Sequence, residues 1–417
     1  MEYRSFGKVD FRPSALGFGA MRLPKLAAAP VAATTTTTTT SAPDSIDHDA
    51  ATAMLRYAVE RGVNYVDTAY VYHEGASEVW LGRALREVAR AVYGGGEEAW
   101  KAFRQRVKVA TKLPVWKCQD SSDFDRYFEE QLGRLGLPSI DFYLLHGLDA
   151  DRWAQVHEAG VLDWAKRMKD KGRIAWFGFS FHDDLATFKE IVDATKRWDF
   201  CQIQYNYMDE DYQAGSEGLR YAAGKGLGVV VMEPIRGGHL AGPAPETVAA
   251  LWRRAEAEGF DGAPRTPVGW ALQWVWDHAE VGPVLSGMSA MDQVVENVAC
   301  AECSRTGRLT AAERGLVAEV RDAYRQLSVI ACTACDYCQP CREGVEIPRI
   351  FAIYNDAVMY DNRDAAREFY TWVAEEHRAD RCTHCGECEA RCPQKLPVIE
   401  WLEVCQRFLC EPPSAAS

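Results

Sequence analysis

The sequence predicts an α/β fold, a (β/α)8 TIM barrel followed by a small helical domain, and three observations support this fold class. Short apolar segments alternate with amphipathic helical segments through the first three hundred residues of the 417-residue chain. The alternation occurs eight times, and a barrel of eight such units takes roughly 250 residues before insertions. The strand pattern then ends near residue 305, and cysteines become frequent.

Each predicted strand is a short apolar run, and most of them are rich in β-branched or aromatic residues. The eight strands are Leu16–Ala20, Tyr65–Ala69, Val107–Thr111, Phe142–Leu145, Ala175–Ser180, Cys201–Tyr205, Gly228–Met232 and Pro283–Ser286. A doubly wound open sheet is the competing fold. It would place a glycine-rich dinucleotide fingerprint after an early strand, and the sequence has none there, which favours the barrel.

The segments between these strands have the amphipathic pattern of helices. The predicted helices are Asp49–Arg61, Ser77–Val92, Asp123–Leu135, Val161–Lys171, Asp184–Thr195 and Thr266–Asp277, and the last repeat closes near Met291–Ala299. Two insertions enlarge the barrel. Residues 26–45, with the threonine run Thr34–Thr40, are predicted to form a disordered low-complexity loop. Residues 93–106 lengthen the connection before the third strand.

After the barrel the sequence predicts a separate helical domain. Its predicted helices are Ala311–Leu327, Ile347–Tyr360, Asp364–Glu376 and Ile399–Leu409, and they surround two cysteine runs at 332–341 and 382–392. We therefore expect a barrel domain at 1–304 and a C-terminal domain at 305–417. Two domains are also expected from length, because the chain exceeds the size at which one hydrophobic core stops growing.

Composition narrows the classes of partner. With 47% hydrophobic and 26% charged residues, the chain reads as an ordinary soluble globular protein. Its net charge of -13, without a Lys/Arg run, argues against a nucleic-acid partner, because phosphate binding needs a basic face. The apolar runs are too short to cross a bilayer and no secretory signal is visible, so we expect a reducing, cytoplasmic location. There, fourteen clustered cysteines indicate metal ligands rather than disulfides.

Four polar residues follow the ends of three consecutive predicted strands. They are Asp67, Tyr72, Lys112 and His146. Because the C-terminal ends of barrel strands meet at one rim, we expect these side chains to converge there. A tyrosine has a pKa near 10, and a close ammonium eases loss of its proton. Lys112 would be that ammonium and Asp67 would keep it charged. Tyr72 would then donate a proton to a substrate oxygen that His146 orients.

Each of these residues taken alone has a structural alternative. Tyr72 could be a packing tyrosine, His146 a hydrogen-bonded rim histidine, and Asp67 with Lys112 a structural ion pair. The convergence of all four at one rim favours catalysis over these alternatives.

The order of these motifs resembles the catalytic signature of the aldo-keto reductase family. The matching stretches are Asp67-Thr-Ala-Tyr-Val-Tyr72-His-Glu-Gly-Ala-Ser77-Glu78, then Leu81-Gly82, Thr111-Lys112 and Leu145-His146, and the resemblance covers about residues 3–300. It implies that Asp67, Tyr72, Lys112 and His146 form the family's catalytic tetrad. It also implies hydride transfer between NADPH or NADH and a small carbonyl substrate, or the reverse oxidation of an alcohol.

The same resemblance assigns cofactor positions. Ser180 and Gln202 would hold the nicotinamide carboxamide, although Phe181 replaces a common asparagine and Met232 replaces a stacking aromatic residue. For the phosphate and adenosine end the resemblance implies Gly237, Gly238, Gly287, Ser289, Gln293 and Asn297.

The choice between NADP and NAD stays open, because Gln293 stands where many NADP-specific members carry an arginine. The alternative for Gln293 and Asn297 is simple solvation on an exposed helix face.

The cysteine spacing points to iron–sulfur clusters. Cys382-x2-Cys385-x2-Cys388-x3-Cys392-Pro393 has the bacterial ferredoxin spacing for [4Fe-4S] ligation. The first run, Cys332, Cys335, Cys338 and Cys341, departs from it in the last gap and in Arg342, which follows in place of proline. Zinc ribbons usually pair CxxC knuckles 15 to 20 residues apart, whereas 40 residues separate these two runs. We therefore favour two cubanes over zinc.

Two assignments of the eight cysteines stay open. By analogy with two-cluster ferredoxins, each cluster would take three cysteines from one run and the last cysteine of the other. The simpler assignment gives each run its own cluster.

Barrel and cysteine domain together resemble a subgroup of aldo-keto reductases with a C-terminal ferredoxin-type [4Fe-4S] domain. The sequence leads to an NAD(P)H-dependent carbonyl reductase whose clusters are structural or exchange electrons with a partner protein. One alternative is a reductase driven by ferredoxin or flavoprotein electrons through the clusters. Another is a non-catalytic redox sensor, which would not need the proton donor.

Overall fold

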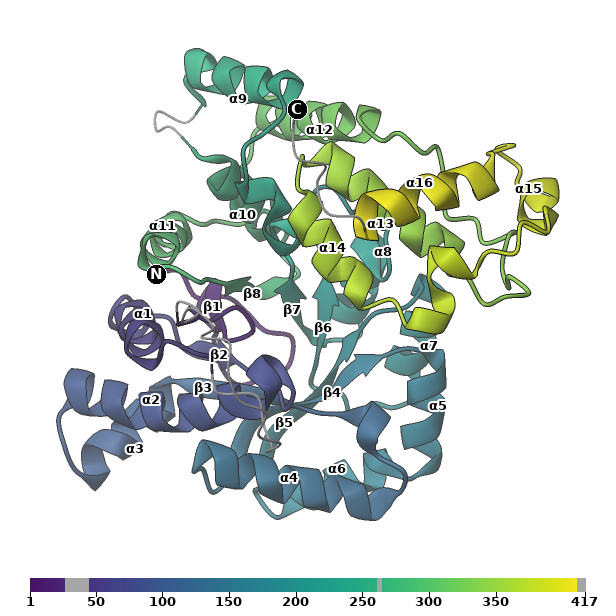
Figure 1. Ribbon diagram of the computed structural model, residues 1–417. Coiled ribbons are helices and arrows are strands. Elements are labelled where there is room, and N and C mark those ends of the chain that lie inside the picture. The colour runs from purple at the N-terminus through teal and green to yellow at the C-terminus, as the bar shows by residue number, and fades with distance from the viewer. Residues whose placement is uncertain (27–44, 261–264, 411–417) are drawn as a thin grey trace, which may run out of the picture. The chain divides into compact units, whose positions relative to one another are not determined.

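The computed structural model describes residues 1–26, 45–260 and 265–410 (Figure 1). The predicted loop at 26–45 lies almost entirely outside the described residues. The chain divides into two compact units, and we call Met1–Gly237 with Val268–Thr310 the barrel unit. The helical unit comprises Gly238–Pro267 and Ala311–Ser417, so it includes a segment that the sequence prediction placed within the barrel domain.

The barrel unit contains a closed sheet of eight parallel strands in sequential order, which confirms the predicted fold class. The strands are β1 (Leu16–Gly19), β2 (Tyr65–Asp67), β3 (Lys108–Leu113), β4 (Ile140–Leu148), β5 (Ile174–Phe181), β6 (Phe200–Gln204), β7 (Gly228–Met232) and β8 (Val281–Gly287). The barrel closes where β1 pairs with β8, with Leu16 opposite Val284 and Gly19 opposite Gly287. Every strand therefore ends at the same rim.

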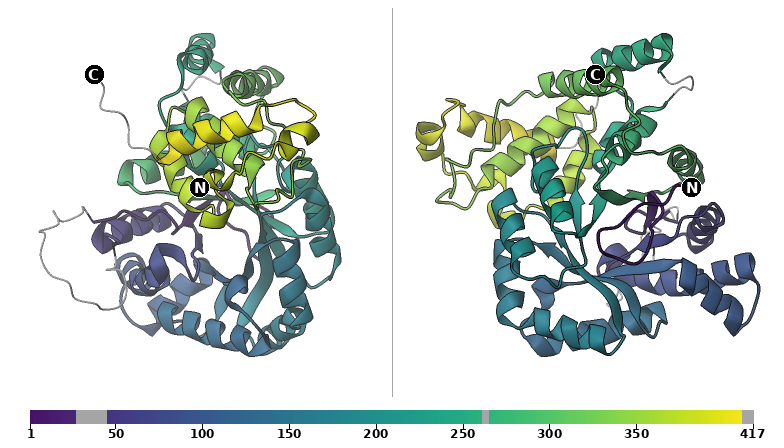
Figure 2. Two further views of the ribbon diagram at one scale, coloured as in Figure 1. Left: turned by 45° about the vertical axis from the view of Figure 1, so that its right-hand side comes forward. Right: turned by 180° about the vertical axis from the view of Figure 1, so that it is seen from behind.

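Helices surround this sheet, as Figure 2 shows from two further directions. They are α1 (His48–Glu60), α2 (Ala76–Tyr93), α3 (Glu97–Arg106), α4 (Ser121–Leu135), α5 (Ala150–Glu158), α6 (Val161–Asp170), α7 (Leu185–Asp193), α8 (Gly215–Gly224), α10 (Pro267–Trp276) and α11 (Met291–Glu302). Aspartate side chains cap α1, α4, α5 and α7 by accepting backbone N–H groups of the first turn. The insertion before β3 forms α3, whose Phe103 is fully buried.

Aromatic side chains fill the barrel at the end opposite the rim. Phe6, from the N-terminal segment, lies with its ring 5.9 Å from that of Phe142 and 6.0 Å from that of Phe200. Glycines make room for it, because a Cβ on Gly228 would lie 2.5 Å from the Phe6 ring. This close packing leaves the opposite rim as the open end of the barrel.

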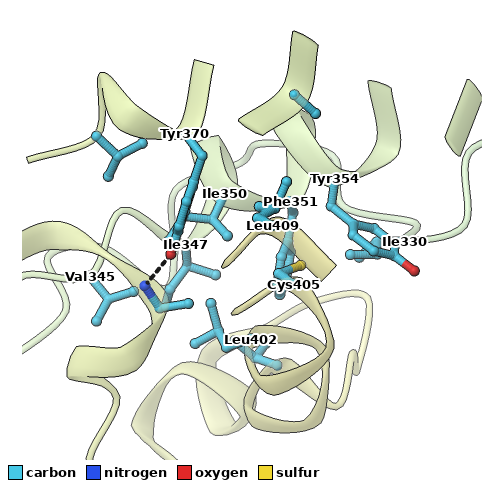
Figure 3. Packing of buried hydrophobic residues seen from close by; sticks show 14 of the residues in the cluster. Ile330, Val345, Ile347, Ile350, Phe351, Tyr354, Tyr370, Leu402, Cys405 and Leu409 are labelled. Atoms are coloured by element: carbon cyan, nitrogen blue, oxygen red, sulfur yellow. Dashed lines mark hydrogen bonds between the residues drawn. The ribbon is translucent and has the colours of Figure 1, made fainter. Parts of the chain in front are cut away.

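The helical unit packs around its own apolar core. Its helices are α9 (Glu246–Glu258), α12 (Ala311–Gln326), α13 (Ile347–Met359), α14 (Arg363–Thr371), α15 (Glu387–Arg391) and α16 (Val398–Cys410). Ile350, Phe351 and Leu402 are almost completely buried, and the Tyr370 hydroxyl accepts a hydrogen bond from the backbone N–H of Ala379 at 3.0 Å (Figure 3). α9 joins this unit through an ion pair between Arg254 and Glu319 of α12 at 2.8 Å. Among the helices that the structure describes, none is long and apolar enough to cross a membrane.

Candidate functional site

The barrel rim brings together the four polar residues singled out in the sequence. Asp67 ends β2, Lys112 lies in β3 and His146 lies in β4, while Tyr72 begins the short helical turn Tyr72–Gly75 after β2. The parallel register places Asp67 opposite Ala110 of β3, and Lys112 opposite Leu144 of β4. Neighbouring strands therefore deliver these side chains to one small region.

Lys112 is the centre of this group, and its side chain is fully buried. The ammonium Nζ lies 2.5 Å from Asp67 Oδ1, 2.9 Å from the carbonyl oxygen of Thr68 and 3.2 Å from the Tyr72 hydroxyl. An ammonium has three protons to donate, and these three acceptors take all of them. The position of Nζ is thus fixed.

The ion pair keeps Lys112 charged in spite of burial. Burial lowers the pKa of Lys112, but the Asp67 carboxylate and the Tyr72 oxygen raise it, and the net pKa lies above the ordinary value of 10.5. For Asp67 the effect of burial is larger than that of its partner. Burial raises the pKa of Asp67, Lys112 lowers it, and the net pKa lies above the ordinary value. The electrostatic role expected for Asp67 agrees with this arrangement.

The pKa of Tyr72 differs from the expectation based on the ammonium alone. Lys112 does lower the pKa of the Tyr72 phenol, but burial raises it more, and the Asp67 and Glu233 carboxylates raise it further. The net pKa therefore lies above 10, so Tyr72 holds its proton at neutral pH. A group that holds its proton can act as an acid but not as a base.

His146 lies beside Tyr72, with the two ring centroids 5.9 Å apart and the rings nearly perpendicular. Burial, with the nearby positive charge of Lys112, holds the pKa of His146 well below 6.5, so the ring is neutral at neutral pH. Its Nδ1 is buried and has no hydrogen-bond partner among the described residues. A neutral ring has one N–H donor and one acceptor nitrogen, so the unpaired Nδ1 leaves hydrogen-bonding capacity unused in this ring.

The two residues predicted to hold the carboxamide lie side by side on adjacent strands. Ser180 of β5 is in register with Gln202 of β6, and both are buried. Gln202 donates a hydrogen bond to the Met232 sulfur at 3.4 Å, but its buried Oε1 has no partner among the described residues. An unpaired buried amide oxygen suits an amide N–H donor, so this pair fits a nicotinamide carboxamide.

The remaining predicted cofactor residues lie around β7, β8 and α11. Gly237 and Gly238 both have positive φ, and they fall on either side of the division between the two units. Gly287 ends β8, where a Cβ would lie 3.3 Å from the Arg22 side chain, so a larger residue would require Arg22 to shift. The backbone N–H of Ser289 donates to Gln293 Oε1 at 2.8 Å.

The sequence alternative of a solvated face is wrong for Asn297. Its side chain is only 3% exposed, and Nδ2 donates to Ser286 Oγ at 2.9 Å. Asn297 therefore anchors α11 to the end of β8, whereas Gln293 one turn earlier is exposed. Sequence spacing alone could not show on which face of α11 the strand end packs.

Two residues at this rim were missed by the sequence reasoning. Trp116 follows β3, and its ring lies 5.1 Å from that of His146. Arg152 lies over the Trp116 ring at 5.5 Å and donates to the carbonyl oxygen of Gly147 at 2.8 Å. The position of Trp116 just after a predicted strand was a signal that could have revealed it.

The cysteine runs line two cavities in the helical unit. One cavity, with about 410 Å³ of empty space including space open to solvent, is lined by Cys338, Cys341, Cys382, Cys385 and Cys388. The other, with about 360 Å³, is lined by Cys332, Cys335, Cys338 and Cys392. Each cavity is therefore lined by cysteines of both runs, and Cys338 lines both cavities.

Interactions between the thiols follow the same pattern. Burial raises the pKa of Cys332, and its neighbours Cys335 and Cys392 raise it further. Burial likewise raises the pKa of Cys382, with further contributions from Cys341 and Cys385. The pKa of Cys338 is likewise raised by burial and by Cys332 and Cys388, so thiols of the two runs lie near one another throughout this region.

These cavities differ from sites for one metal ion. Among the described residues, no group of three or more His, Cys, Asp or Glu is arranged to hold a metal ion. A cubane accepts its thiolates at four separate iron atoms, so its ligands surround a volume and do not meet at a point. Thiols spread over the walls of each cavity fit that requirement.

Comparison with known proteins agrees with both parts of the chain. Residues 15–307 match the family model described as the Aldo/keto reductase family. Residues 331–396 match the model described as a 4Fe-4S dicluster domain.

Several similar proteins are enzymes. The chain is 27% identical over 313 residues to the L-galactose dehydrogenase of Arabidopsis thaliana, which covers 72% of this chain and 88% of that protein. It is 24% identical over 292 residues to the NADH-specific methylglyoxal reductase of Escherichia coli, which covers 64% and 85%.

Solved structures show the same fold. The holo form of an aldo-keto reductase from Bacillus halodurans has a TM-score of 0.57 at 26% identity, covering 77% of this chain and 96% of that chain. An aldo-keto reductase from Klebsiella pneumoniae in complex with NADPH has a TM-score of 0.54 at 21% identity, covering 76% and 94%.

Proposed function

Because the chain belongs to the aldo/keto reductase family, and is therefore an oxidoreductase, we propose that it reduces a small aldehyde or ketone with NADPH or NADH. The observation that carries the proposal is the buried contact of Lys112 with both Asp67 and Tyr72. A buried ammonium that contacts a tyrosine hydroxyl stabilises the phenolate that forms when the tyrosine donates its proton, so this arrangement suits general acid catalysis. A structural ion pair alone would not need the phenol.

In this proposal Tyr72 donates its proton to the carbonyl oxygen of the substrate. The phenolate that remains is stabilised by the Lys112 ammonium at 3.2 Å, and Asp67 keeps that ammonium charged and in place. The neutral His146 ring donates its N–H to the same oxygen and so orients the substrate. The nicotinamide, when bound, supplies the hydride to the carbonyl carbon and accepts one in the reverse reaction.

We further propose that the cofactor lies along the ends of β5 to β8. Ser180 and Gln202 would hold the carboxamide, and Gly237, Gly238, Gly287, Ser289, Gln293 and Asn297 would form the binding region for the rest of the cofactor. The buried, unpaired Oε1 of Gln202 supports the first part. Gln293 has no charge to attract a 2′-phosphate, so both NADPH and NADH are to be tested.

The cavities of the helical unit would hold two [4Fe-4S] clusters. We assign Cys332, Cys335, Cys338 and Cys392 to one cluster, because these cysteines line one cavity, and Cys341, Cys382, Cys385 and Cys388 to the other. Cys338 lines both cavities, which supports two adjacent clusters. Neighbouring clusters suit a role in passing single electrons to a partner protein, in addition to bracing the unit.

The test is the steady-state rate at which anaerobically reconstituted protein reduces methylglyoxal, the aldehyde in the name of one relative. Consumption of NADPH or NADH should depend on the aldehyde, and Tyr72→Phe should lower kcat by about 10²–10⁴-fold, the usual contribution of a general acid. Affinity for the cofactor should not change. Turnover that survives in Tyr72→Phe would remove the proton-donor assignment.

The same preparation tests the electron-transfer role. Cluster absorbance that bleaches when NADPH is added would reveal electron flow into the clusters, as in the alternative reductase driven through them. Absorbance that stays constant during aldehyde turnover would leave the clusters outside the barrel reaction.

A further inference from the structure

A fully buried carboxylate lies behind the proposed tetrad and has no part in it. Glu78 is in the first turn of α2 (Ala76–Tyr93), and its exposure is 0%. A buried carboxylate is unfavourable unless hydrogen bonds or charges compensate it. Its partners show what the residue does.

Both oxygens of Glu78 are engaged by other elements. Oε1 accepts from Thr111 Oγ1 at 2.6 Å and from Gln131 Nε2 at 2.7 Å, while Oε2 accepts from Arg134 Nη1 at 3.3 Å. Thr111 belongs to β3, and the other two partners belong to α4. The carboxylate therefore joins α2, α4 and β3 at one point.

One branch of this network reaches Lys112. Gln131 Nε2, besides its bond to Glu78, donates to the backbone carbonyl oxygen of Lys112 at 3.0 Å. The other end of the amide is fixed, because Gln131 Oε1 accepts from the Tyr143 hydroxyl at 2.7 Å. Gln131, itself fixed by Glu78 and Tyr143, therefore holds the backbone of Lys112 in place.

The second branch reaches the turn that carries Tyr72. Arg134 Nη1 donates to the carbonyl oxygen of Tyr70 at 3.0 Å, and a Cβ added to Gly75 would lie 3.3 Å from the same nitrogen. Arg134 therefore contacts the chain on both sides of Tyr72.

That turn is strained, so it needs support. After Tyr72, His73 has φ of 49° and Glu74 has φ of 57°, and Gly75 follows with φ of 94°. Non-glycine residues in the left-handed region cost free energy and persist only where their surroundings hold them. Arg134 provides such support, and it is held both by Glu78 and by Glu130, which accepts from Arg134 Nη2 at 2.6 Å.

We propose that Glu78 is a positioning residue, which sets the distance between the Lys112 ammonium and the Tyr72 hydroxyl through Gln131 and Arg134. The proposal rests on the proposed reductase function. It differs from a purely structural role, in which the network would only stabilise the fold. Catalysis depends on small displacements, since a shift of 1 Å can cost about 10²-fold in rate.

The test compares Glu78→Gln with the wild-type chain. The amide keeps the size of the side chain, but it presents an NH2 group or a neutral oxygen to Arg134. Arg134 keeps its ion pair with Glu130, so its hydrogen bond to the Tyr70 carbonyl is weakened and not removed. We expect kcat for methylglyoxal to fall about ten- to hundred-fold, with less than about a two-fold change in cofactor KM. As Lys112 moves away from Tyr72, the tyrosine pKa should rise, and the alkaline limb of the kcat profile should shift to higher pH.

Two further variants test the two branches of the network separately, and a third variant is a control. Arg134→Met should reproduce the change through the Tyr72 turn, and Gln131→Met should do so through Lys112. Glu129→Gln is the matched control. Glu129 lies on α4, as Gln131 and Arg134 do, but it pairs with Arg173 at the surface and does not contact Glu78. It should leave kcat, KM and the pH profile unchanged.

Hydrogen exchange of residues 69–76 and 110–113 gives a readout that does not depend on turnover. It should be faster in Glu78→Gln than in Glu129→Gln, while the remaining strands of the barrel stay protected. An unshifted pH limb together with unchanged exchange in these segments would overturn the proposal. If the wild-type chain reduced no aldehyde, the proposed function would fail, and the exchange comparison would still decide whether Glu78 holds this turn.

Discussion

The barrel rim and the cysteine-lined cavities place reactive groups in opposite ways. At the rim, two strands and the turn after β2 hold Asp67 and Tyr72 within hydrogen-bond distance of Lys112, and the protein itself supplies each partner. In the helical unit, turns between helices and the short helix α15 carry the thiols, and the thiols line cavities without meeting. The rim is therefore stabilised by its own contacts, whereas the cavities are suited to a group that supplies the missing bonds.

The comparison teaches how burial is compensated. An opposite charge offsets the desolvation of Lys112. The thiols of Cys332 and Cys382 have no such partner, and their pKa values are raised by burial and by the neighbouring thiols. Coordination to iron would lower the pKa values of these thiols, because a coordinated thiol is deprotonated outright.

The largest expected effect comes from removing the clusters. Binding of a metal group to thiols contributes directly to folding, so the helical unit should lose its protection when iron is stripped. Hydrogen exchange should then become fast throughout 311–410 and stay slow in the barrel strands. Protection that survives in α13 and α16 after complete loss of iron would show that the apolar core alone holds the unit.

Cysteine substitutions test the interleaved assignment directly. A chain with Cys382, Cys385 and Cys388 all replaced by serine should retain about four iron atoms, held by the other set. Adding Cys392→Ser should remove that iron, whereas adding Cys341→Ser should not. The reverse result would assign one cluster to each run.

The next largest effect is expected at the rim. Lys112→Met leaves the buried Asp67 carboxylate unpaired, and breaking a buried pair in this way costs about 3–5 kcal/mol of stability. Chemical denaturation of the barrel, followed by tryptophan fluorescence, measures the loss. The double variant Asp67→Asn with Lys112→Met should recover part of the stability but none of the turnover. Equal stability of the single variant and the wild type would contradict a paired rim.

A smaller loss of stability is expected from a substitution at Asn355, which contacts the chain just before Cys332. The buried Asn355 accepts the N–H groups of Val329 and Ile330 at 3.1 and 2.8 Å, and it donates to the Ile330 carbonyl at 2.8 Å. Asn355→Ala leaves these backbone groups unpaired, which costs about 1–3 kcal/mol for a buried group.

The loss should appear in the helical unit alone. Thermal unfolding of the cluster-loaded protein, followed by cluster absorbance, should move to lower temperature, while aldehyde turnover at 25 °C should stay unchanged. Asn362→Ala, which removes a cap of α14 at the surface, serves as a control for a lost hydrogen bond outside the core.

The smallest expected effect is a pH dependence of the rim. His146 is neutral in the folded chain because its pKa lies well below the ordinary value of 6.5, whereas the unfolded chain takes up a proton near 6.5. The unfolded state therefore binds more protons as the pH falls below about 6.5, and stability decreases in that range. His146→Gln should lose this contribution. Denaturant midpoints at pH 7.5 and 5.5 measure it, and an identical pH dependence in both proteins would exclude it.

Much of this protein is determined by the local sequence. The alternation of apolar strands and amphipathic helices is sufficient to predict the closed barrel, because a parallel sheet and its helices leave a periodic signature along the chain. The same holds for the rim residues, since a residue that follows a barrel strand must lie at the C-terminal end. The cysteine spacing is equally local, and it predicts the dicluster match at 331–396.

The tertiary structure decided what depends on contacts distant in sequence. It brought cysteines of both runs to the walls of each cavity, although 40 residues separate the two runs. It buried Asn297 against Ser286, and it raised the pKa of Tyr72 through burial more than Lys112 lowers it. It also placed Glu78 behind the rim. Packing and desolvation act through space, so spacing along the chain does not record them.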